Sequence, residues 1–261
     1  MMKLGISYNV FDAEEHLKGS ILQIRDCVDF ISVIYQQTSN YGDKCNKNLV
    51  DLLNSLKSEK LVDEILEYFP LTNVSPHVNE VNKRNMGLFV SEKNGCTHHM
   101  SMDTDEYYVK SQFENMKKII SDGDYDSSAC KMSTYYKEPI YRLDPKEEYY
   151  VTLLFKIRPN VSYVFANQFP VLADPTRKMT PNNFREFSRD EIEMHHMSYV
   201  RKDIEKKVKN SSAKVNFESS IPEFLDYFQN WKFGDKALTL GRPPKKFDIV
   251  KVDDIFNIQI N

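Results

Sequence analysis

The residue types best suited to chemistry are two aspartates in residues 100–107, which have the sequence Met-Ser-Met-Asp-Thr-Asp-Glu-Tyr. Asp103 and Asp105 come at the end of residues 96–102, a run that predicts a buried strand. Alternate side chains near a strand end point the same way, so both carboxylates can reach one divalent cation. Hard oxygen ligands suit Mn²⁺ or Mg²⁺, which keep open positions for phosphate oxygens. The pattern predicts a metal site, although a polar turn after a strand has the same spacing.

A pair of histidines offers a nitrogen ligand to the same cation. His195 and His196 fall within residues 189–210, which we expect to form one long charged helix or two helices. Adjacent side chains on a helix point about 100° apart, so only one of the two histidines would ligate. Mn²⁺ accepts a mixed oxygen and nitrogen set better than Mg²⁺ does. A core or capping role is the alternative for each histidine. His98 and His99, on the predicted strand, are interpreted as structural.

Polar residues also follow two earlier predicted strands. Tyr8 and Asn9 end the first strand, where the tyrosine can stack on a nucleobase and the asparagine can bond to its edge. Gln36 opens a polar run after the second strand that can bind a ribose or a uracil-like edge. Ligands of open α/β sheets bind beyond the carboxyl ends of the strands, which is where these residues fall. A buried tyrosine, a turn asparagine and an ordinary polar loop are the alternatives.

Two adjacent cations precede the strand that leads to Asp103. Lys83 and Arg84 lie on a predicted helix, and a fork of donors of this kind matches the paired oxygens of a diphosphate. The alternative is a helix face that is solvated and binds nothing.

The first half of the chain alternates strand and helix patterns. Such an alternation predicts βαβ units and a mostly parallel sheet. The expected strands are residues 3–9, 30–35, 62–68 (or the end of the preceding helix) and 96–102, and the expected helices are residues 13–27, 46–58 and 79–93.

The second half reads differently, with tyrosine-rich runs that predict antiparallel strands. The expected strands are residues 127–135, 139–143, 149–157 and 161–165, with helices at residues 112–121 and 221–230 and a loop at residues 174–183. No run is long enough to be a linker. We therefore expect a single α/β domain over residues 1–261, with an open mixed sheet flanked by helices.

Composition sets limits on the function. The chain has 261 residues, of which 28% are charged and 41% hydrophobic, as in a globular domain. The net charge of −3 creates no general field toward nucleic acid. No apolar run approaches the roughly 18 residues that span a bilayer. Four cysteines without close spacing indicate free thiols in a reducing compartment, so we expect a cytoplasmic protein.

The order of these segments resembles a GT-A type glycosyltransferase, similar to family 2 enzymes. The matching runs are residues 5–11, 83–88, 102–106 and 195–201. The resemblance covers roughly residues 3–110, and residues 145–215 more loosely. It implies a UDP- or GDP-sugar donor, Mn²⁺ bridging the diphosphate, and transfer of a hexosyl or pentosyl group to a glycan or another hydroxyl acceptor. Residues of about 1–110 would bind the donor and those of about 111–261 the acceptor.

The resemblance also suggests roles for individual residues. Asp105 is the first-choice metal ligand and His196 the third candidate, while Asp103 bonds the metal's waters or the donor ribose. Lys83, Arg84 and Arg201 are expected to contact the diphosphate.

The catalytic base stays open, because many family 2 members carry a late Glu-Asp pair that has no clean copy here. Asp174, in the loop of residues 174–183, is the first candidate for a general base, and Glu148 and Glu191 are alternatives. Two other functions also remain open. A nucleotidyltransferase acting on sugar phosphates would need a glycine-rich first loop, which residues 7–13 lack. A non-catalytic carbohydrate- or nucleotide-binding protein would need no base. The oligomeric state is not predicted.

Overall fold

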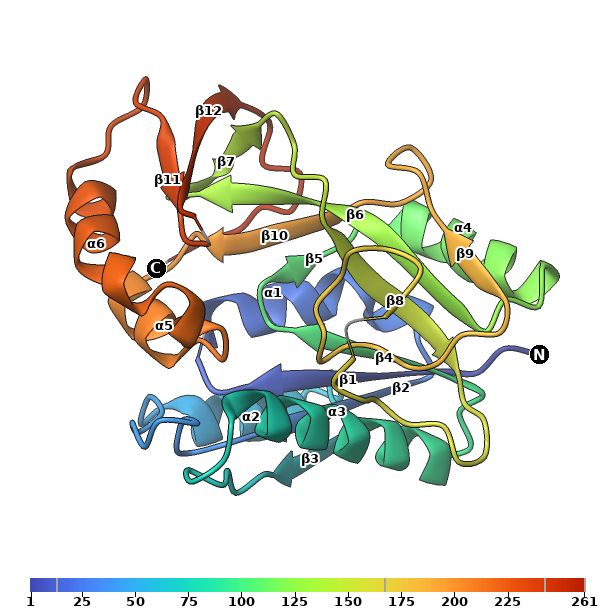
Figure 1. Ribbon diagram of the computed structural model, residues 1–261. Helices are drawn as coiled ribbons and strands as arrows, with labels where there is room; N and C mark the ends of the chain where they lie inside the picture. The colour runs from blue at the N-terminus through green and yellow to red at the C-terminus, as the bar shows by residue number, and fades with distance from the viewer. Residues whose placement is uncertain (13, 167, 242, 261) are drawn as a thin grey trace.

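The computed structural model describes residues 1–12, 14–166, 168–241 and 243–260. Their strands form one mixed sheet with helices packed against it (Figure 1). The strands are β1 Leu4–Val10, β2 Phe30–Tyr35, β3 Glu64–Glu67, β4 His98–Asp103, β5 Glu106–Tyr107, β6 Ser127–Tyr136, β7 Glu138–Asp144, β8 Tyr150–Lys156, β9 Phe184–Glu186, β10 Met194–Tyr199, β11 Ala237–Thr239 and β12 Lys245–Lys251. The helices are α1 Glu14–Ile24, α2 Leu49–Ser58, α3 Pro76–Lys93, α4 Lys110–Asp122, α5 Ile204–Asn210 and α6 Ile221–Asn230.

The first part of the sheet is parallel, in the order β4-β1-β2-β3. Every residue of β1 is buried, as expected for a strand covered on both faces. Successive side chains alternate: Tyr8 bonds Ser20 of α1, whereas Ser7 lies under Gly87 of α3. A Cβ on Gly87 would lie 2.2 Å from the Ser7 Oγ atom, so only glycine lets α3 approach β1 this closely. The carboxyl ends of β1, β2 and β4 therefore meet at one edge.

The second part of the sheet continues from β4 through antiparallel neighbours, in the order β8-β6-β7-β12-β11. Strand β10 lies parallel to β6 and antiparallel to the short strand β5, which follows Asp105. This pairing places a late segment of the chain beside the residues that end β4. Helices α5 and α6 pack against each other at the β10 end of the molecule (Figure 1).

The predicted fold class, an open mixed sheet flanked by helices, is confirmed. All four strands and three helices predicted in the first half are present, with residues 64–67 forming strand β3. Helix α3 begins at Pro76 rather than at residue 79, because proline suits the first helical position. Ala13, the predicted start of the first helix, lies outside the described residues.

Two predictions in the second half were wrong. Residues 189–210 do not form a long helix, because residues 194–199 form β10 and only residues 204–210 are helical. Charged residues lie on either side of β10, so the whole segment was interpreted as helical. The short run between them is a strand because its backbone pairs with β5 and β6. Residues 161–165 do not form a strand, since Val164 makes one isolated bridge with Lys178. Within the described residues, no helix is both long and apolar enough to cross a membrane.

Candidate functional site

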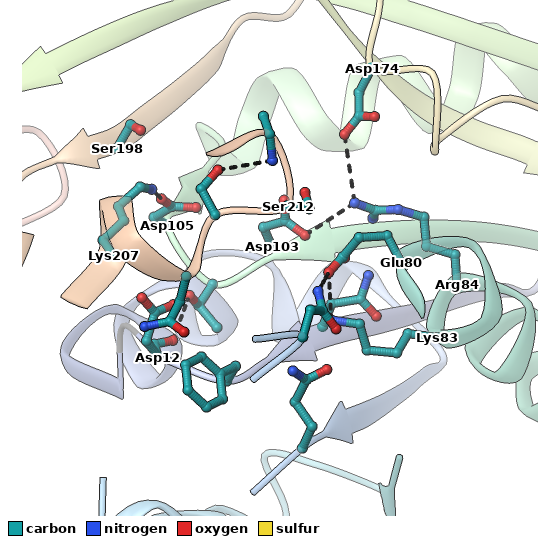
Figure 2. A pocket seen from close by; sticks show the side chains of 18 of the residues that line it. Asp12, Glu80, Lys83, Arg84, Asp103, Asp105, Asp174, Ser198, Lys207 and Ser212 are labelled. Carbon is teal, nitrogen blue, oxygen red and sulfur yellow. Dashed lines mark hydrogen bonds and ion pairs between the residues drawn. The ribbon is translucent and has the colours of Figure 1, made fainter. Parts of the chain in front are cut away.

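A pocket of about 310 Å³ lies at the carboxyl ends of β1, β2 and β4 (Figure 2). We call it the central pocket. Segments from both halves of the chain line it, including the end of β10, helix α5 and the loop that carries Asp174. The predicted site residues that line it are Asn9, Gln36, Lys83, Arg84, Asp103, Asp105, Asp174, His196 and Arg201. The sequence therefore identified much of the lining, and the fold brings these residues together.

Two cationic side chains pair with Asp105 in the pocket. Its Oδ2 atom accepts hydrogen bonds from the guanidinium of Arg201 and, at 2.8 Å, from the Nζ atom of Lys207. Burial alone would raise the pKa of Asp105, but Lys207 and Arg201 hold that pKa well below its usual range. The carboxylate is thus ionised at neutral pH.

His196 faces Asp105 across the edge of the pocket, with 3.6 Å between the His196 Nε2 and Asp105 Oδ2 atoms. Because the two histidines lie on a strand, their side chains point to opposite faces. His195 points away from the pocket, where its Nδ1 atom lies 2.8 Å from the Tyr135 hydroxyl and its ring packs on Phe256. Only His196 can reach a ligand in the pocket.

Asp105 and His196 fit part of a metal-binding set, since a carboxylate oxygen and an imidazole nitrogen face the same space. Asp103, like Asp105, is already paired with cationic side chains. Its Oδ2 atom lies 2.5 Å from Arg177, and its Oδ1 atom lies 3.5 Å from Arg84. In the part of the chain that the structure describes, no three His, Cys, Asp or Glu side chains form a group able to hold a metal. A cation here would take its other ligands from water and from a bound diphosphate.

Two buried arginines, Arg84 and Arg177, pair with Asp103 and Asp174. Arg84 donates to the Ser101 hydroxyl at 2.8 Å and lies 3.8 Å from Asp174 (Figure 2). Arg177 contacts both Asp103 and the buried Glu106. Although desolvation raises the pKa of Asp103, Arg177 and Arg84 bring it below its usual range. The Arg84 guanidinium is therefore directed at Asp103 and Asp174, which leaves it less free to bind a diphosphate than its sequence position suggested.

Three further cations line the pocket. Lys83 is buried and pairs with Glu80 at 2.9 Å, and Arg201 also lies 3.9 Å from Asp12. Lys207 reaches in from α5, where burial and then the nearby Arg201 lower its pKa. Sequence reasoning missed Lys207 and Arg177. Nothing in their local sequence separates them from the surface lysines and arginines of their segments.

A cluster of buried amides lies on the β1 and β2 side of the pocket. Both polar atoms of the Asn9 side chain, the Gln36 Oε1 atom and the Asn40 Oδ1 atom have no hydrogen-bond partner among the described residues. The three side chains are 8%, 1% and 6% exposed. A buried polar group without a partner is unfavourable by about 1–3 kcal/mol, so these amides are suited to a ligand that supplies partners.

The aromatic side chain in the pocket is not the predicted Tyr8. Tyr8 does not line the pocket, because its ring is buried in the core and its hydroxyl lies 3.0 Å from Ser20 Oγ. Successive side chains on a strand point to opposite faces, so Tyr8 points away from the face that carries Asn9. Phe11, two residues after Asn9, is the aromatic side chain that lines the pocket.

Among the candidate bases, only Asp174 lines the central pocket. Its Oδ1 atom accepts hydrogen bonds from the backbone N–H and the hydroxyl of Thr176, both at 2.8 Å. Glu148 is exposed and pairs with Lys131. Glu191 accepts hydrogen bonds from the backbone N–H and the hydroxyl of Ser188, both at 2.9 Å. Both glutamates lie outside the pocket.

Comparison with solved structures identifies the fold. The chain is similar to residues 1–349 of S. aureus TarS, with a TM-score of 0.50 and 12% identity over 88% of this chain and 72% of that one. A longer TarS chain aligns with a TM-score of 0.49 and 12% identity over 89% of this chain, and this chain spans only 45% of its length. The complex of TarS 1–349 with UDP-GlcNAc gives a TM-score of 0.49 at 12% identity over 88% of this chain and 73% of that one.

TarS is a GT-A type glycosyltransferase similar to family 2, so the resemblance drawn from the sequence is confirmed for the fold. No protein-family model matches the chain. No curated protein sequence matches it either.

Proposed function

We propose that this protein is a metal-dependent glycosyltransferase that moves a hexosyl or pentosyl group from a nucleoside-diphosphate sugar to an acceptor hydroxyl. The observation that supports it most is the meeting of Asp105 and His196 in a pocket that also holds cationic side chains. A diphosphate and the pocket's carboxylates are both negatively charged, and a metal cation between them would offset that repulsion. Lys83, Arg201 and Lys207 supply further positive charge for its oxygens.

The donor's nucleoside would occupy the amide side of the pocket. The Asn9, Gln36 and Asn40 side chains offer both donors and acceptors without partners. A base with an N–H next to a carbonyl, such as uracil or guanine, presents the complementary groups. Phe11 offers an apolar face beside them. This assignment supports a UDP- or GDP-sugar, with Asp103 near the ribose or the waters of the metal.

The transfer step would use Asp174 as the base. The acceptor oxygen forms a bond to the anomeric carbon while the bond from that carbon to the diphosphate oxygen breaks, and the nucleoside diphosphate leaves with the electron pair. Asp174 accepts the proton of the acceptor hydroxyl. A single displacement of this kind inverts the anomeric configuration. A metal bound at Asp105 and His196 would supply positive charge that offsets the charge growing on the departing diphosphate.

The two halves of the chain would then have different roles. Residues 1–110 carry the amides, Lys83 and the two aspartates, which suits donor binding. Residues 111–261 contribute His196, Arg201, Lys207 and Asp174 to the same pocket. The first three would then contact the donor, and Asp174 would face the acceptor.

The first test is nucleotide binding. UDP or GDP should raise the melting temperature in Mn²⁺ and should leave it almost unchanged in EDTA. Asp105→Asn, which keeps the shape of the side chain, should abolish the effect. Asp26→Asn, at an aspartate whose side chain is 78% exposed on the surface, is the matched control and should retain it.

If the nucleotide raises the melting temperature equally in Mn²⁺ and in EDTA, nucleotide binding does not depend on a metal. A screen of nucleotide-sugars for Mn²⁺-dependent hydrolysis then tests the reaction itself. Release of pyrophosphate from a nucleoside triphosphate and a sugar phosphate would instead identify a nucleotidyltransferase.

A further inference from the structure

A second cavity, of about 940 Å³, lies beside the central pocket. We call it the side cavity. The loop between β7 and β8, the segment after α5 and the hairpin of β11 and β12 form its walls. Its volume is near the upper end of the roughly 300–1,000 Å³ that ligand pockets span. It has room for more than one sugar ring.

The side cavity and the central pocket share one lining residue, and one short segment contributes a residue to each. Ala213 lines both. Leu172 lines the side cavity, and Asp174, on the same short segment, lines the central pocket. The backbone N–H of Tyr150 donates to the Leu172 carbonyl at 3.0 Å, which anchors this segment to β8. A ligand in the side cavity can therefore extend toward Asp174.

A third observation connects the two spaces. Tyr149 lines the side cavity, and burial followed by the negative charge of Asp174 raises the pKa of its hydroxyl to about 12. The Tyr149 hydroxyl therefore lies within electrostatic range of the Asp174 carboxylate, the candidate base. An acceptor ring that packs on Tyr149 would bring its hydroxyl groups to the vicinity of Asp174.

The lining combines apolar faces with polar groups. Tyr149, Phe217, Leu240 and Phe247 supply aromatic and aliphatic surface. Sugar rings have apolar C–H faces that pack on aromatic rings and hydroxyl groups that exchange hydrogen bonds with polar side chains. A lining of this kind suits a carbohydrate better than it suits a purely apolar chain.

The acidic side chains of the lining already have partners, and one of its lysines does too. Lys146 pairs with Glu193 at 2.7 Å, Glu148 pairs with Lys131, and Glu147 accepts a hydrogen bond from Thr134. The first two pairs join opposite charges, and the lining as a whole holds two lysines and two glutamates, so its formal charges cancel. The lining of the side cavity therefore offers no excess charge that would favour a strongly charged ligand.

We propose that the side cavity binds the acceptor, and that this acceptor is a neutral oligosaccharide of two or more sugar rings with its reacting hydroxyl at Asp174. The identification of the ligand as the acceptor rests on the proposed function, whereas the binding of a neutral oligosaccharide does not. The two statements can be tested separately.

The experiment measures binding directly, without a donor. Wild-type protein is titrated with neutral disaccharides to hexasaccharides of glucose, galactose, mannose and N-acetylglucosamine. Leu172→Arg places a bulky cation at the rim of the side cavity, where the leucine is 69% exposed, so folding should not suffer. Leu22→Arg, at a leucine that is 54% exposed on α1, is the matched control. UDP and GDP binding in Mn²⁺ is measured on the same three proteins.

We expect at least one oligosaccharide to bind more tightly than its monosaccharide. Leu172→Arg should weaken that binding by about tenfold or more, equivalent to about 1.4 kcal/mol, and Leu22→Arg should leave it unchanged. Nucleotide binding should be the same in all three proteins. No binding by any neutral oligosaccharide, or binding that Leu172→Arg does not change, would overturn the inference. Oligosaccharide binding without any nucleotide binding would retain the neutral-glycan site and contradict the proposed function instead.

Discussion

At the scale of single residues, the proposed metal site depends on the Asp105 and His196 pair. Their facing atoms are 3.6 Å apart, and the adjacent His195 points into the Tyr135 and Phe256 cluster. His195 and His196 therefore have different surroundings, so a substitution of His195 is the control for the same substitution of His196.

We predict that His196→Ala raises the Mn²⁺ concentration needed for half-maximal stabilisation by a nucleoside diphosphate. The increase should be at least about tenfold, since even lost outer-shell partners weaken metal binding by about 10–100-fold. His195→Ala should lower the melting temperature without a comparable change in the Mn²⁺ requirement. Thermal melts across a Mn²⁺ titration measure both effects. The reverse order would assign the ligand to His195, and no effect of either would leave Asp105 as the protein ligand.

Asp174 allows a second prediction at this scale. Asp174→Asn should lower the rate of transfer by about 10²-fold or more, because general-base catalysis contributes that much. Nucleotide affinity should stay nearly unchanged, since the base acts on the acceptor. Initial rates and nucleotide titrations on the same preparation separate the two. A large loss of nucleotide affinity would place Asp174 in the donor site, and full activity would favour Glu148, Glu191 or a retaining mechanism.

At the scale of elements, β10 and α5 carry the second half of the chain to the site. Strand β10 positions His196, and the next helix supplies Lys207, which bonds Asp105 at 2.8 Å. Helix α5 has only 7 residues, so its own hydrogen bonds contribute little stability. Its position on the pocket therefore depends on contacts such as this ion pair.

We predict that Lys207→Met lowers the melting temperature of the metal-free protein, because the buried Asp105 loses one of its two cationic partners. Removing one partner of a buried pair costs about 3–5 kcal/mol, and the remaining Arg201 should reduce that loss. Added Mn²⁺ should restore part of the stability by supplying positive charge. Lys209→Met, on the same helix but in an exposed pair with Glu205, is the control and should change little. A Lys207→Met protein as stable as wild type without metal would show that the ion pair does not stabilise α5.

At the scale of the whole molecule, four histidines are buried in a neutral state. Burial lowers the pKa of His16, His98 and His195 to about 4 and that of His99 to about 3. In the unfolded chain a histidine has a pKa of about 6.5, so below that pH the unfolded chain binds protons that the folded protein does not. Stability is therefore fully present above about pH 6.5 and falls as the pH decreases toward the folded-state pKa values.

This linkage predicts a lower melting temperature at pH 5 than at pH 7. Each histidine should contribute a loss of up to about 2 kcal/mol at pH 5. Denaturant unfolding at several pH values measures the slope. The slope should be reduced in His99→Gln, whose side chain cannot be protonated in this range. Stability that is constant between pH 7 and pH 5 would contradict buried neutral histidines.

The sequence by itself determined the parallel half of the sheet and a large part of the pocket lining. Period-two and period-3.6 patterns are properties of short windows, so the strand at residues 30–35 and the helix predicted at residues 46–58 can be assigned without the rest of the chain. Strand ends then locate Asn9, Gln36, Asp103 and Asp105, because the carboxyl ends of parallel strands meet at one edge.

Only the tertiary structure decided which residues from the second half join that edge. Strand β10 was mistaken for a helix, since its identity comes from pairing with β5 and β6 rather than from its own short pattern. Arg177 and Lys207 reach the two aspartates from a loop and a short helix whose paths follow no periodic rule. The side cavity likewise depends on how three distant segments pack. Contacts between such segments arise from the complete fold, which local sequence patterns do not encode.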